Sequence, residues 1–330
     1  MMTCRSYLSY ATWALVFTLT DALFAIASFA QTYPTRAIRI IVPFAPGGAS
    51  DLLPRMLGQK LAEAWGQQII IDNRPGAAGN IGMELGARAP ADGYTLLSAP
   101  NGNLVVNPHM YSRLPYDVFR DLAPVTLIAA VQNVFVVHPS LPVKNMRELV
   151  ALAKMRPGNL TYGSPGNGSQ GHVGVELLKM MAGIDMTHVP YNGVGPAMRE
   201  LLGGQISLAL AQTQAAIPHI QSGKLRAIAA ASAKRLTILP ELPTVTESTY
   251  NGFEAVSWYA LMAPAGTPKD VISRLSTECA RAVQLPDIRE RLSALGAEAV
   301  GSSPDQLVAT MRTESPRWAK VIKVAGIRAD

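Results

Sequence analysis

The amino-acid sequence predicts an α/β protein of two lobes. From residue 33 onward, short apolar runs alternate with segments of helical periodicity, which is typical of βαβ units. The length of 330 residues suits about two domains. One long extended stretch also separates two sets of these units. The composition, with 48 % hydrophobic but only 6 % aromatic residues, favours an aliphatic core joined by many tight loops.

The first set of units begins with an apolar strand over 37–44, followed by a turn over 45–51 and a helix. Pro54 is compatible with this helix only if it starts near Ser50 or Asp51, because first-turn N–H groups lack partners in any case. The Gly-Gly turn then lies directly at a helix N-terminus. A strand over 68–72, a helix over 80–89 and a strand over 94–98 follow. The loop 99–103 comes next, at a strand's carboxyl end, where open α/β sheets bind ligands.

The second set begins after an extended stretch over 125–137 that is long enough to cross between lobes. Its expected elements are the strands 160–164, 186–191, 206–210 and 225–230 and the helices 172–181 and 196–202. The chain returns through 253–262, and three further helices are expected to pack on the first lobe: 268–285, 286–295 and 304–324. We expect a mostly parallel sheet, and a hinge and cleft where the chain crosses twice.

These patterns predict how the chain is divided. The expected segments are a signal peptide over 1–30, a first lobe over 31–130 and 256–330, and a second lobe over 131–255. Arg5, the apolar run 11–20 and the small residues Ser28 and Ala30 before Gln31 are typical of an export signal, so we expect a periplasmic protein. Asp21 interrupts the apolar run, which argues against a permanent membrane span. Without residues 1–30 the chain keeps one cysteine, Cys279, and so no internal disulfide is expected.

The charge excludes one class of partner. The formal net charge of +6 is modest, and Lys and Arg are scattered without a basic run, so nucleic acid is not an expected partner. A mildly basic surface does favour the approach of anions.

Two strand–turn–helix elements carry the strongest local signal, one in each expected lobe. They are the turns Pro46-Gly-Gly-Ala49 and Ser164-Pro-Gly-Asn-Gly-Ser169. Glycine lets a ligand approach the backbone closely, and a helix N-terminus offers unpaired N–H donors and a partial positive charge that suit a carboxylate. If the turns face each other across a cleft, they can hold one anion without an arginine. Each can equally be a tight βα turn with no ligand.

Other chemistries fit poorly. Neither turn continues into Gly-Lys-Ser/Thr, and the spacing of Gly76-Ala-Ala-Gly-Asn-Ile-Gly82 does not match a dinucleotide fingerprint. Ser169 lacks the glycine two positions before it that a nucleophile elbow requires. His172 and Glu176 share a helix face without a third metal ligand at a readable spacing. We therefore expect no cofactor, no metal and no catalytic residue, and Asp51 is as plausible a helix cap as a ligand contact.

The sequence closely resembles the Bug-type substrate-binding proteins of tripartite tricarboxylate transporters. The resemblance covers nearly the whole chain after residue 30. It is carried, in order, by the segments 40–51, 73–79, 90–95, 114–117, 121–125, 162–169 with His172, 189–193 with 196–197, 223–226, 240–244 and 263–268.

The resemblance implies a periplasmic fold of the type II Venus-flytrap kind and a small carboxylate, amino acid or aromatic acid as the ligand. It implies that backbone amides of the two Gly-rich turns hold one carboxylate. The expected ligand-binding residues, from the match and from the residues beside it, are Phe44, Gly47, Gly48, Ala49, Asp51, Ser98, Asn101, Ser164, Gly166, Gly168, Ser169, His172, Tyr191, Asn192 and Gly193. Pro54, Asp21, Asn101 and Asn103 depart from the expected pattern, and the two asparagines favour a ligand with a polar far end.

Three functions follow as hypotheses. The first is a binding protein that delivers a small organic acid to integral-membrane transporter components. The second is a receptor that passes the bound state to a sensor protein, because both need the same two lobes. The third is an enzyme on the same scaffold, which lacks an assembled nucleophile, base or metal set.

Overall fold

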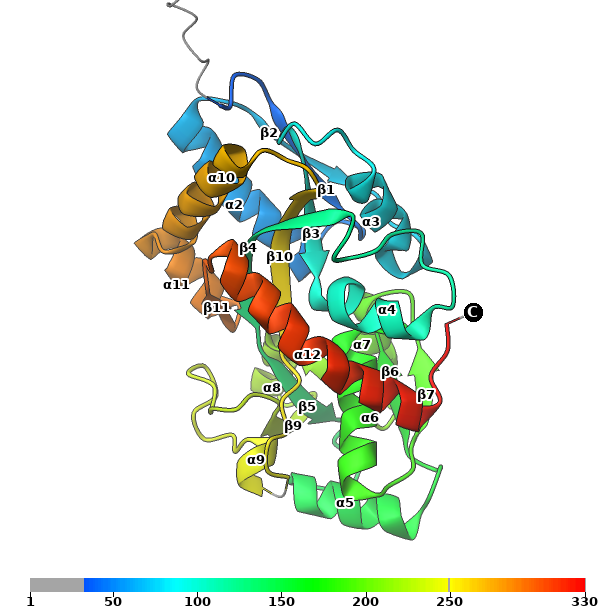
Figure 1. Cartoon of the computed structure of the whole chain (residues 1–330). Coiled ribbons are helices and arrows are strands. Elements are labelled where there is room, and N and C mark those ends of the chain that lie inside the picture. The colour runs from blue at the N-terminus through cyan, green and yellow to red at the C-terminus, as the bar shows by residue number, and fades with distance from the viewer. Residues whose placement is uncertain (1–32, 249, 330) are drawn as a thin grey trace, which may run out of the picture. The chain divides into compact units, whose positions relative to one another are not determined.

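The computed structural model describes residues 33–248 and 250–329, and the expected signal peptide lies outside this range. Between residues 37 and 329 the described chain builds two β-sheets with helices packed on them (Figure 1). This confirms the α/β prediction. Among the residues described, no helix combines the length and the apolar character needed to cross a lipid bilayer.

The first sheet has the strand order β11-β4-β10-β3-β1-β2. Its strands are β1 (Ile38–Val42), β2 (Ile69–Asn73), β3 (Thr95–Pro100), β4 (Leu122–Val131), β10 (Ser257–Pro264) and β11 (Ala297–Ala299). β1 pairs in parallel with β2 and β3, in the register Ile40 to Ile71 and Ile40 to Leu96. β10 is antiparallel to both β3 and β4, and β11 is antiparallel to β4.

The second sheet has the order β7-β6-β8-β5-β9. Its strands are β5 (Asn133–Val137), β6 (Thr161–Ser164), β7 (Thr187–Pro190), β8 (Leu208–Gln212) and β9 (Arg226–Ala230). β6 is parallel to β7 and β8, whereas β5 is antiparallel to β8 and β9. The expectation of a mostly parallel sheet is therefore wrong. Strands β4, β5 and β10 border the crossings, and each runs antiparallel to its neighbours there.

The helices that pack on the first sheet include α2 (Ala49–Trp65), α3 (Asn80–Ala87), α10 (Lys269–Val283) and α11 (Pro286–Ala294). Those beside the second are α5 (Met146–Met155), α6 (Gln170–Ala182), α7 (Val194–Leu202), α8 (Thr213–Gln221) and the short α9 (Val245–Ser248). The turns η1 (Ala77–Gly79) and η2 (Gly102–Val106) precede α3 and α4 (Asn107–Met110). The sequence reading did not identify α4, α5, α8, α9 or β11.

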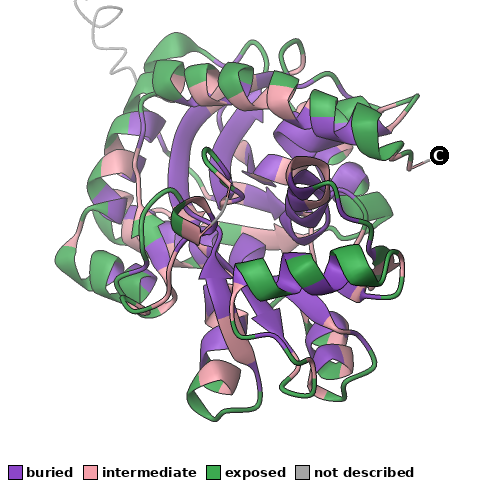
Figure 2. Ribbon diagram, turned by 90° about the horizontal axis from the view of Figure 1, so that it is seen from below, coloured by how far each residue is buried: buried purple, intermediate pink, exposed green. Residues whose placement is uncertain are grey.

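The last helix, α12 (Pro304–Ala325), reaches further than its expected packing on the first lobe. It contacts β4 of the first sheet and also α6 beside the second. Glu314 accepts hydrogen bonds from the indole N–H groups of Trp258 (2.8 Å) and Trp318 (3.2 Å), which attaches the helix to β10. One hydrophobic cluster accordingly includes Leu97, Phe135 and Trp318. Figure 2 shows the strands of both sheets as mostly buried.

The chain passes between the sheets at two places. The first crossing is Gln132, between β4 and β5, and the second runs from Ala255 into β10 at Ser257. The side-chain amide of Asn133 donates to the carbonyl of Ala255 at 2.7 Å and to Ser257 Oγ at 3.1 Å, so the two crossings are joined directly. The division into residue ranges that we expect for the lobes stays a prediction.

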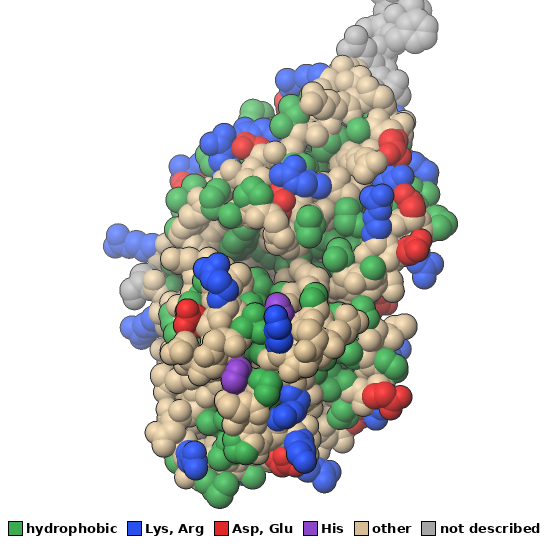
Figure 3. Space-filling model, turned by 180° about the vertical axis from the view of Figure 1, so that it is seen from behind, with side chains coloured by type: hydrophobic (Ala, Val, Ile, Leu, Met, Phe, Trp, Pro, Cys, Tyr) green, Lys and Arg blue, Asp and Glu red, His purple; other side chains and the backbone are tan. Residues whose placement is uncertain are grey.

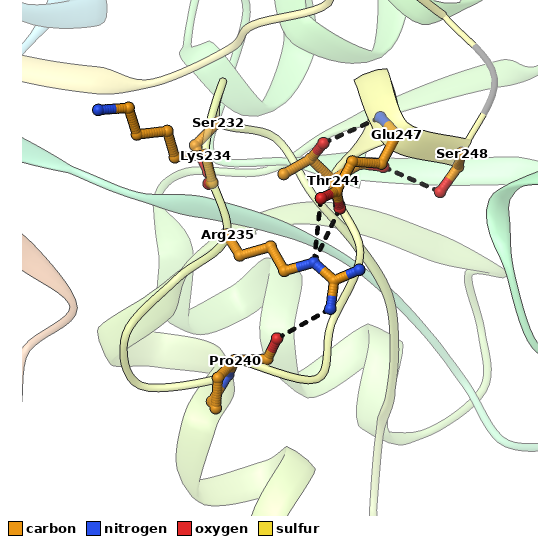
Figure 4. Close-up of polar contacts among 7 residues, drawn as sticks. All are labelled: Ser232, Lys234, Arg235, Pro240, Thr244, Glu247 and Ser248. Carbon is orange, nitrogen blue, oxygen red and sulfur yellow. Dashed lines mark hydrogen bonds and ion pairs between the residues drawn. The ribbon is translucent and has the colours of Figure 1, made fainter.

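The loop after β9 is held by a polar cluster (Figure 4). Arg235 Nε donates to both carboxylate oxygens of Glu247, at 3.1 and 3.0 Å, and the Arg235 guanidinium donates to the carbonyl of Pro240. Thr244 and Glu247 bond each other's backbone N–H groups, which makes a capping box before α9. Pro240 and Thr244, the two ends of the segment 240–244, thus have a structural role in this loop. None of the expected ligand-binding residues lines the small apolar pocket formed by Ala227 and residues 238–242.

Candidate functional site

The first Gly-rich turn leads directly from β1 into α2. Gly48 is the N-cap residue, and it has no side chain that could cap the helix. Gly47 has a φ of +101°, a conformation that an L-residue rarely adopts. A Cβ atom added to either glycine would meet nothing within 4 Å. The turn therefore presents bare backbone to open space at a helix N-terminus.

The side chain of Asp51 stabilises this turn through hydrogen bonds. Its carboxylate accepts hydrogen bonds from the N–H of Gly47 (3.1 Å), from Arg55 Nε (3.0 Å) and from Asn73 Nδ2 (3.0 Å). Burial alone would raise the pKa of Asp51, but the bonds from Arg55, Asn73 and Gly47 outweigh it and leave the pKa below its usual value. Asp51 thus stays ionised, and the Gly47 N–H is already occupied.

The remaining amides of the turn are available. Within the residues described, the N–H groups of Gly48, Ala49 and Ser50 have no hydrogen-bond partner. α2 starts at Ala49, so Pro54 lies beyond the first turn and deprives the Ser50 carbonyl of its helical partner. Ser98 Oγ lies 3.5 Å from that carbonyl and donates to it, which places Ser98 beneath the start of the helix.

Phe44 and the asparagines lie beside this turn. The carbonyl of Phe44 accepts from Asn73 Nδ2 at 2.9 Å, and its ring lies next to Gly79 and Asn103. Asn103 donates to the carbonyl of Ala78 at 3.0 Å. The Asn103 bond holds the turn over 76–80 against η2, so Asn103 has a structural role here.

The second Gly-rich turn is largely satisfied by its own side chains. Ser164 Oγ accepts from the N–H of Gly166 at 3.2 Å, and Ser169 Oγ donates to the carbonyl of Gly166 at 2.7 Å. His172 Nδ1 accepts from the N–H of Gly168 at 3.2 Å. Ser169 also caps α6 through a bond from the N–H of His172. In this structure the Gly166 and Gly168 amides therefore have partners, and the exposed Asn167 has the N–H without one among the described residues.

Gly168 lies where the two sheets approach. Its φ is +76°, and an added Cβ would stand 2.8 Å from Asn107 Oδ1 and 3.0 Å from Met110 Sδ, both in α4. A Cβ at Gly102 would stand 3.1 Å from the carbonyl oxygen of Gly168. The positive φ of Gly168 and the close approach of its carbonyl to Gly102 both favour glycine at these positions.

Two histidines form a neutral stack behind the second turn. The rings of His172 and His188 are parallel, and that of Tyr162 stacks on His188 at a centroid distance of 4.8 Å. Burial, and then the Lys179 ammonium, lower the pKa of His172 to about 4; burial and the neighbouring His172 lower that of His188 to about 3. His188 Nε2 lies 2.7 Å from Ser164 Oγ, so the stack supports both ends of the turn.

The segment 191–193 borders the second turn. The N–H of Tyr191 donates to the carbonyl of Ser164, and that of Gly193 donates to the carbonyl of Pro165. Tyr191 is half-buried and Asn192 is exposed. Gly193 is the N-cap of α7 and has no side-chain cap bond, like Gly48 on α2.

Side-chain hydrogen bonds connect the two sheets at two places. Asn101 Nδ2 donates to Gln170 Oε1 at the start of α6 (3.2 Å) and to the carbonyl of Val256 on the second crossing (3.0 Å). Gln212 Nε2, at the carboxyl end of β8, donates to the hydroxyl of Tyr259 in β10 at 2.7 Å. These bonds tie the surroundings of the first turn to those of the second, while no bond joins the turns directly within the residues described.

Charge at the site is sparse. The buried carboxylates of Asp51 and Glu176 are each paired, with Arg55 and with Lys179, at 2.9 and 2.8 Å. Lys and Arg side chains are spread over the face seen in Figure 3 without gathering into one patch. In residues 33–248 and 250–329, no group of three or more His, Cys, Asp or Glu is placed to hold a metal ion.

Sequence reasoning did not identify Gln170, Gln212 or Tyr259. Gln212 ends a strand before a helix, which is a usable signal for a ligand site. Tyr259 lies inside an apolar run and carries no local signal. Its contact with Gln212 depends on the pairing of two sheets.

One protein family and several of its known members match this chain over most of its length. The sequence profile of the family described as "Tripartite tricarboxylate transporter family receptor" matches residues 53–327. Protein BugT of Bordetella pertussis is 39 % identical over 300 residues, which cover 91 % of this chain and 92 % of BugT.

Solved structures show the same fold. Rpa4515 of Rhodopseudomonas palustris, determined with adipate, is 38 % identical with a TM-score of 0.84, and the match covers 90 % of this chain and 99 % of that one. MatC of the same organism, with bound malate, is 31 % identical with a TM-score of 0.80 and covers 88 % and 100 %. The periplasmic binding protein BugD is 34 % identical with a TM-score of 0.81 and covers 90 % and 99 %. These similarities confirm the two-lobed periplasmic-binding-protein fold with two crossings.

Proposed function

The chain belongs to the family of tripartite tricarboxylate transporter receptors, and from that premise we propose that it is a periplasmic protein that captures a small carboxylate between its lobes. It releases the acid chemically unchanged to integral-membrane transporter components. The lobes that close are residues 31–130 with 256–330 and residues 131–255, joined at Gln132 and at Ala255–Ser257.

One observation carries the carboxylate. The N–H groups of Gly48, Ala49 and Ser50 are unpartnered among the described residues and lie at the start of a long helix, and Gly48 borders open space. Such a helix start attracts an anion through its N–H donors and its partial positive charge. The turn needs no cation of its own for this. Adipate in Rpa4515 and malate in MatC support a small acid as the ligand class.

The second turn supports the other side of the acid. Asn167 offers an unpartnered N–H in the described part of the chain, and Ser164 and Ser169 offer hydroxyl groups. Gly166 and Gly168 shape this turn, and their amides reach the ligand only if they exchange the bonds that they make here. We place Tyr191, Asn192 and Gly193 along the same wall.

A thermal-shift screen tests the proposal. At about 100 times its Kd, a ligand adds roughly 2.7 kcal/mol to the free energy of unfolding. We expect one member of a panel of di- and tricarboxylates, acidic amino acids and aromatic acids to raise the melting temperature. Stabilisation by a neutral sugar, with no effect of any acid, would overturn the proposal.

A substitution of the turn sharpens this test. Ala49→Pro deletes one N–H donor, and proline is well tolerated at the first position of a helix. The extended Gly48 backbone (φ −90°, ψ 175°) is also compatible with a following proline. We expect this variant to fold and to bind the acid at least about fivefold more weakly. The control Ala49→Ser retains the N–H and is expected to bind normally.

A further inference from the structure

Three buried side-chain atoms lack a hydrogen-bond partner within the described residues, and all three belong to glutamine amides: Gln132 Oε1, Gln170 Nε2 and Gln214 Oε1. Gln132 is the first crossing, Gln170 opens α6, and Gln214 lies in the first turn of α8. Gln170 is bonded to Asn101, which follows β3, and Gln214 is bonded through Gln212 to Tyr259 of β10, so all three lie near the junction of the two sheets. Buried polar atoms are almost always bonded, so such exceptions mark atoms that are free to bind a ligand or a water.

The orientation of Gln214 follows from its neighbours. Gln214 Nε2 donates to Gln212 Oε1 at 3.0 Å, and Gln212 Nε2 in turn donates to the Tyr259 hydroxyl at 2.7 Å. This relay uses the nitrogen end of the Gln214 amide. Its oxygen is therefore the end that needs a donor.

The relay leads back to the start of α2. The Tyr259 hydroxyl also lies beside the Ser50 side chain, which is one residue beyond Ala49. On the other side, the N–H of Thr213 donates to the carbonyl of Gln132 at 2.9 Å, which brings Gln132 beside the residue that precedes Gln214. The two unpartnered oxygens thus lie at one end of a polar path whose other end is the proposed carboxylate anchor.

The chemistry of this end is neutral and accepting. No charged side chain takes part in the hydrogen bonds described for Gln132, Gln212, Gln214 or Tyr259. Two amide oxygens without donors repel a carboxylate and attract an N–H or O–H group. Resting on the proposed function, we propose that Gln214 and Gln132 bind the far end of the ligand and select an uncharged hydrogen-bond donor there. The preferred ligand is an acid with a carboxamide or hydroxyl at its other end, rather than a second carboxylate.

A ligand series tests this directly on the unmodified protein. Linear acids of about four to eight carbons are compared by calorimetry in three forms: with a terminal carboxamide, with a terminal carboxylate and with a methyl end. At the best chain length, we expect the carboxamide to bind about tenfold more tightly than either other form. Equal or tighter binding of the dicarboxylate would overturn the inference and leave the proposed function intact. Binding by no acid of any length would overturn both.

Variants of Gln214 identify the residue that selects. Gln214→Leu removes the acceptor, and we expect a five- to tenfold loss of affinity for the carboxamide but not for the methyl-ended acid. Gln214→Lys places an ammonium there and is expected to shift the preference to the dicarboxylate. Gln221→Leu, at the exposed end of the same helix, is the control. An equal loss for all three ligand forms in Gln214→Leu would indicate a structural role and refute selection.

Discussion

The imidazole rings of His172 and His188 stack face to face, with centroids 3.9 Å apart and planes 5° from parallel. One ring accepts the Gly168 N–H and the other contacts Ser164 Oγ, so both support the second Gly-rich turn. Protonation of His172 at Nδ1 removes that acceptor and places a charge against a buried partner. The two neutral rings therefore stabilise the folded turn. The charged groups that act on this pair are Glu176 and Lys179.

The stack predicts a loss of stability in mild acid. The pKa of His172 is about 4 in the folded chain and about 6.5 when unfolded, so the unfolded state binds more protons between these values. Stability is complete above pH 6.5 and falls as the pH decreases. Urea unfolding should lose about 2 kcal/mol from His172 alone between pH 7 and pH 5.

The variant His172→Gln provides the comparison. It keeps an acceptor for the Gly168 N–H but cannot titrate, so its loss of stability between pH 7 and pH 5 should be smaller by about that amount. His219→Gln, on α8 and outside the stack, should behave like the unmodified protein. A profile for His172→Gln that matches the unmodified protein would contradict this prediction.

Gly47 and Gly48 form a matched pair for a second prediction. Both border open space, but Gly47 has a φ of +101° and Gly48 a φ of −90°. Gly47→Ala should lower the free energy of unfolding by about 1–3 kcal/mol because of backbone strain alone. Gly48→Ala should change it by less than about 1 kcal/mol. Urea titration measures both, and equal effects would show that strain does not separate the two positions.

Asp51 should contribute strongly to stability. In Asp51→Ala, the Gly47 N–H and the Asn73 amide lose a partly buried acceptor, and we expect a loss of about 1–2 kcal/mol. The low folded pKa of Asp51 means that its contribution is present at neutral pH and disappears as the pH falls below about 4. The control is Asp287→Ala, since Asp287 forms an exposed ion pair with Lys60, and its effect on stability should be clearly smaller than that of Asp51→Ala.

The bond between Gln212 and Tyr259 should be measurable as a coupling between the two sheets. A double-mutant cycle with Tyr259→Phe and Gln212→Leu isolates it, because each change removes one partner with little change in volume. We expect a coupling of about 1 kcal/mol in the free energy of unfolding. Strictly additive effects would mean that the bond contributes nothing to stability.

Much of the local structure could be predicted because it depends on residues close in the chain. The strand over 37–44, the helix after Gly48 and the helix over 304–324 appear as β1, α2 and α12 with small shifts at their ends. Hydrophobic periodicity and caps determine such elements. Whether Gly47, Gly48 and Ala49 bind a ligand stays a prediction.

Contacts between distant segments were not predictable in the same way. The antiparallel course of β10, the link from Asn133 to Ala255 and the extension of α12 to α6 each join segments far apart in sequence. Asn101 illustrates the difference. Its expected contact with a ligand stays a prediction, and the structure adds bonds from its amide nitrogen to Gln170 and to the Val256 carbonyl.

The α/β class, the family resemblance and the placing of two Gly-rich turns at helix starts follow from the amino-acid sequence, because periodicity and turn chemistry are local properties. Which amides of these turns stay available depends on the folded chain. Gly47, Gly166 and Gly168 donate to Asp51, Ser164 and His172, whereas Gly48 and Ala49 have no partner among the described residues. An N–H group is occupied when the folded chain brings an acceptor within about 3 Å of it, and the order of residue types in these turns does not determine that distance.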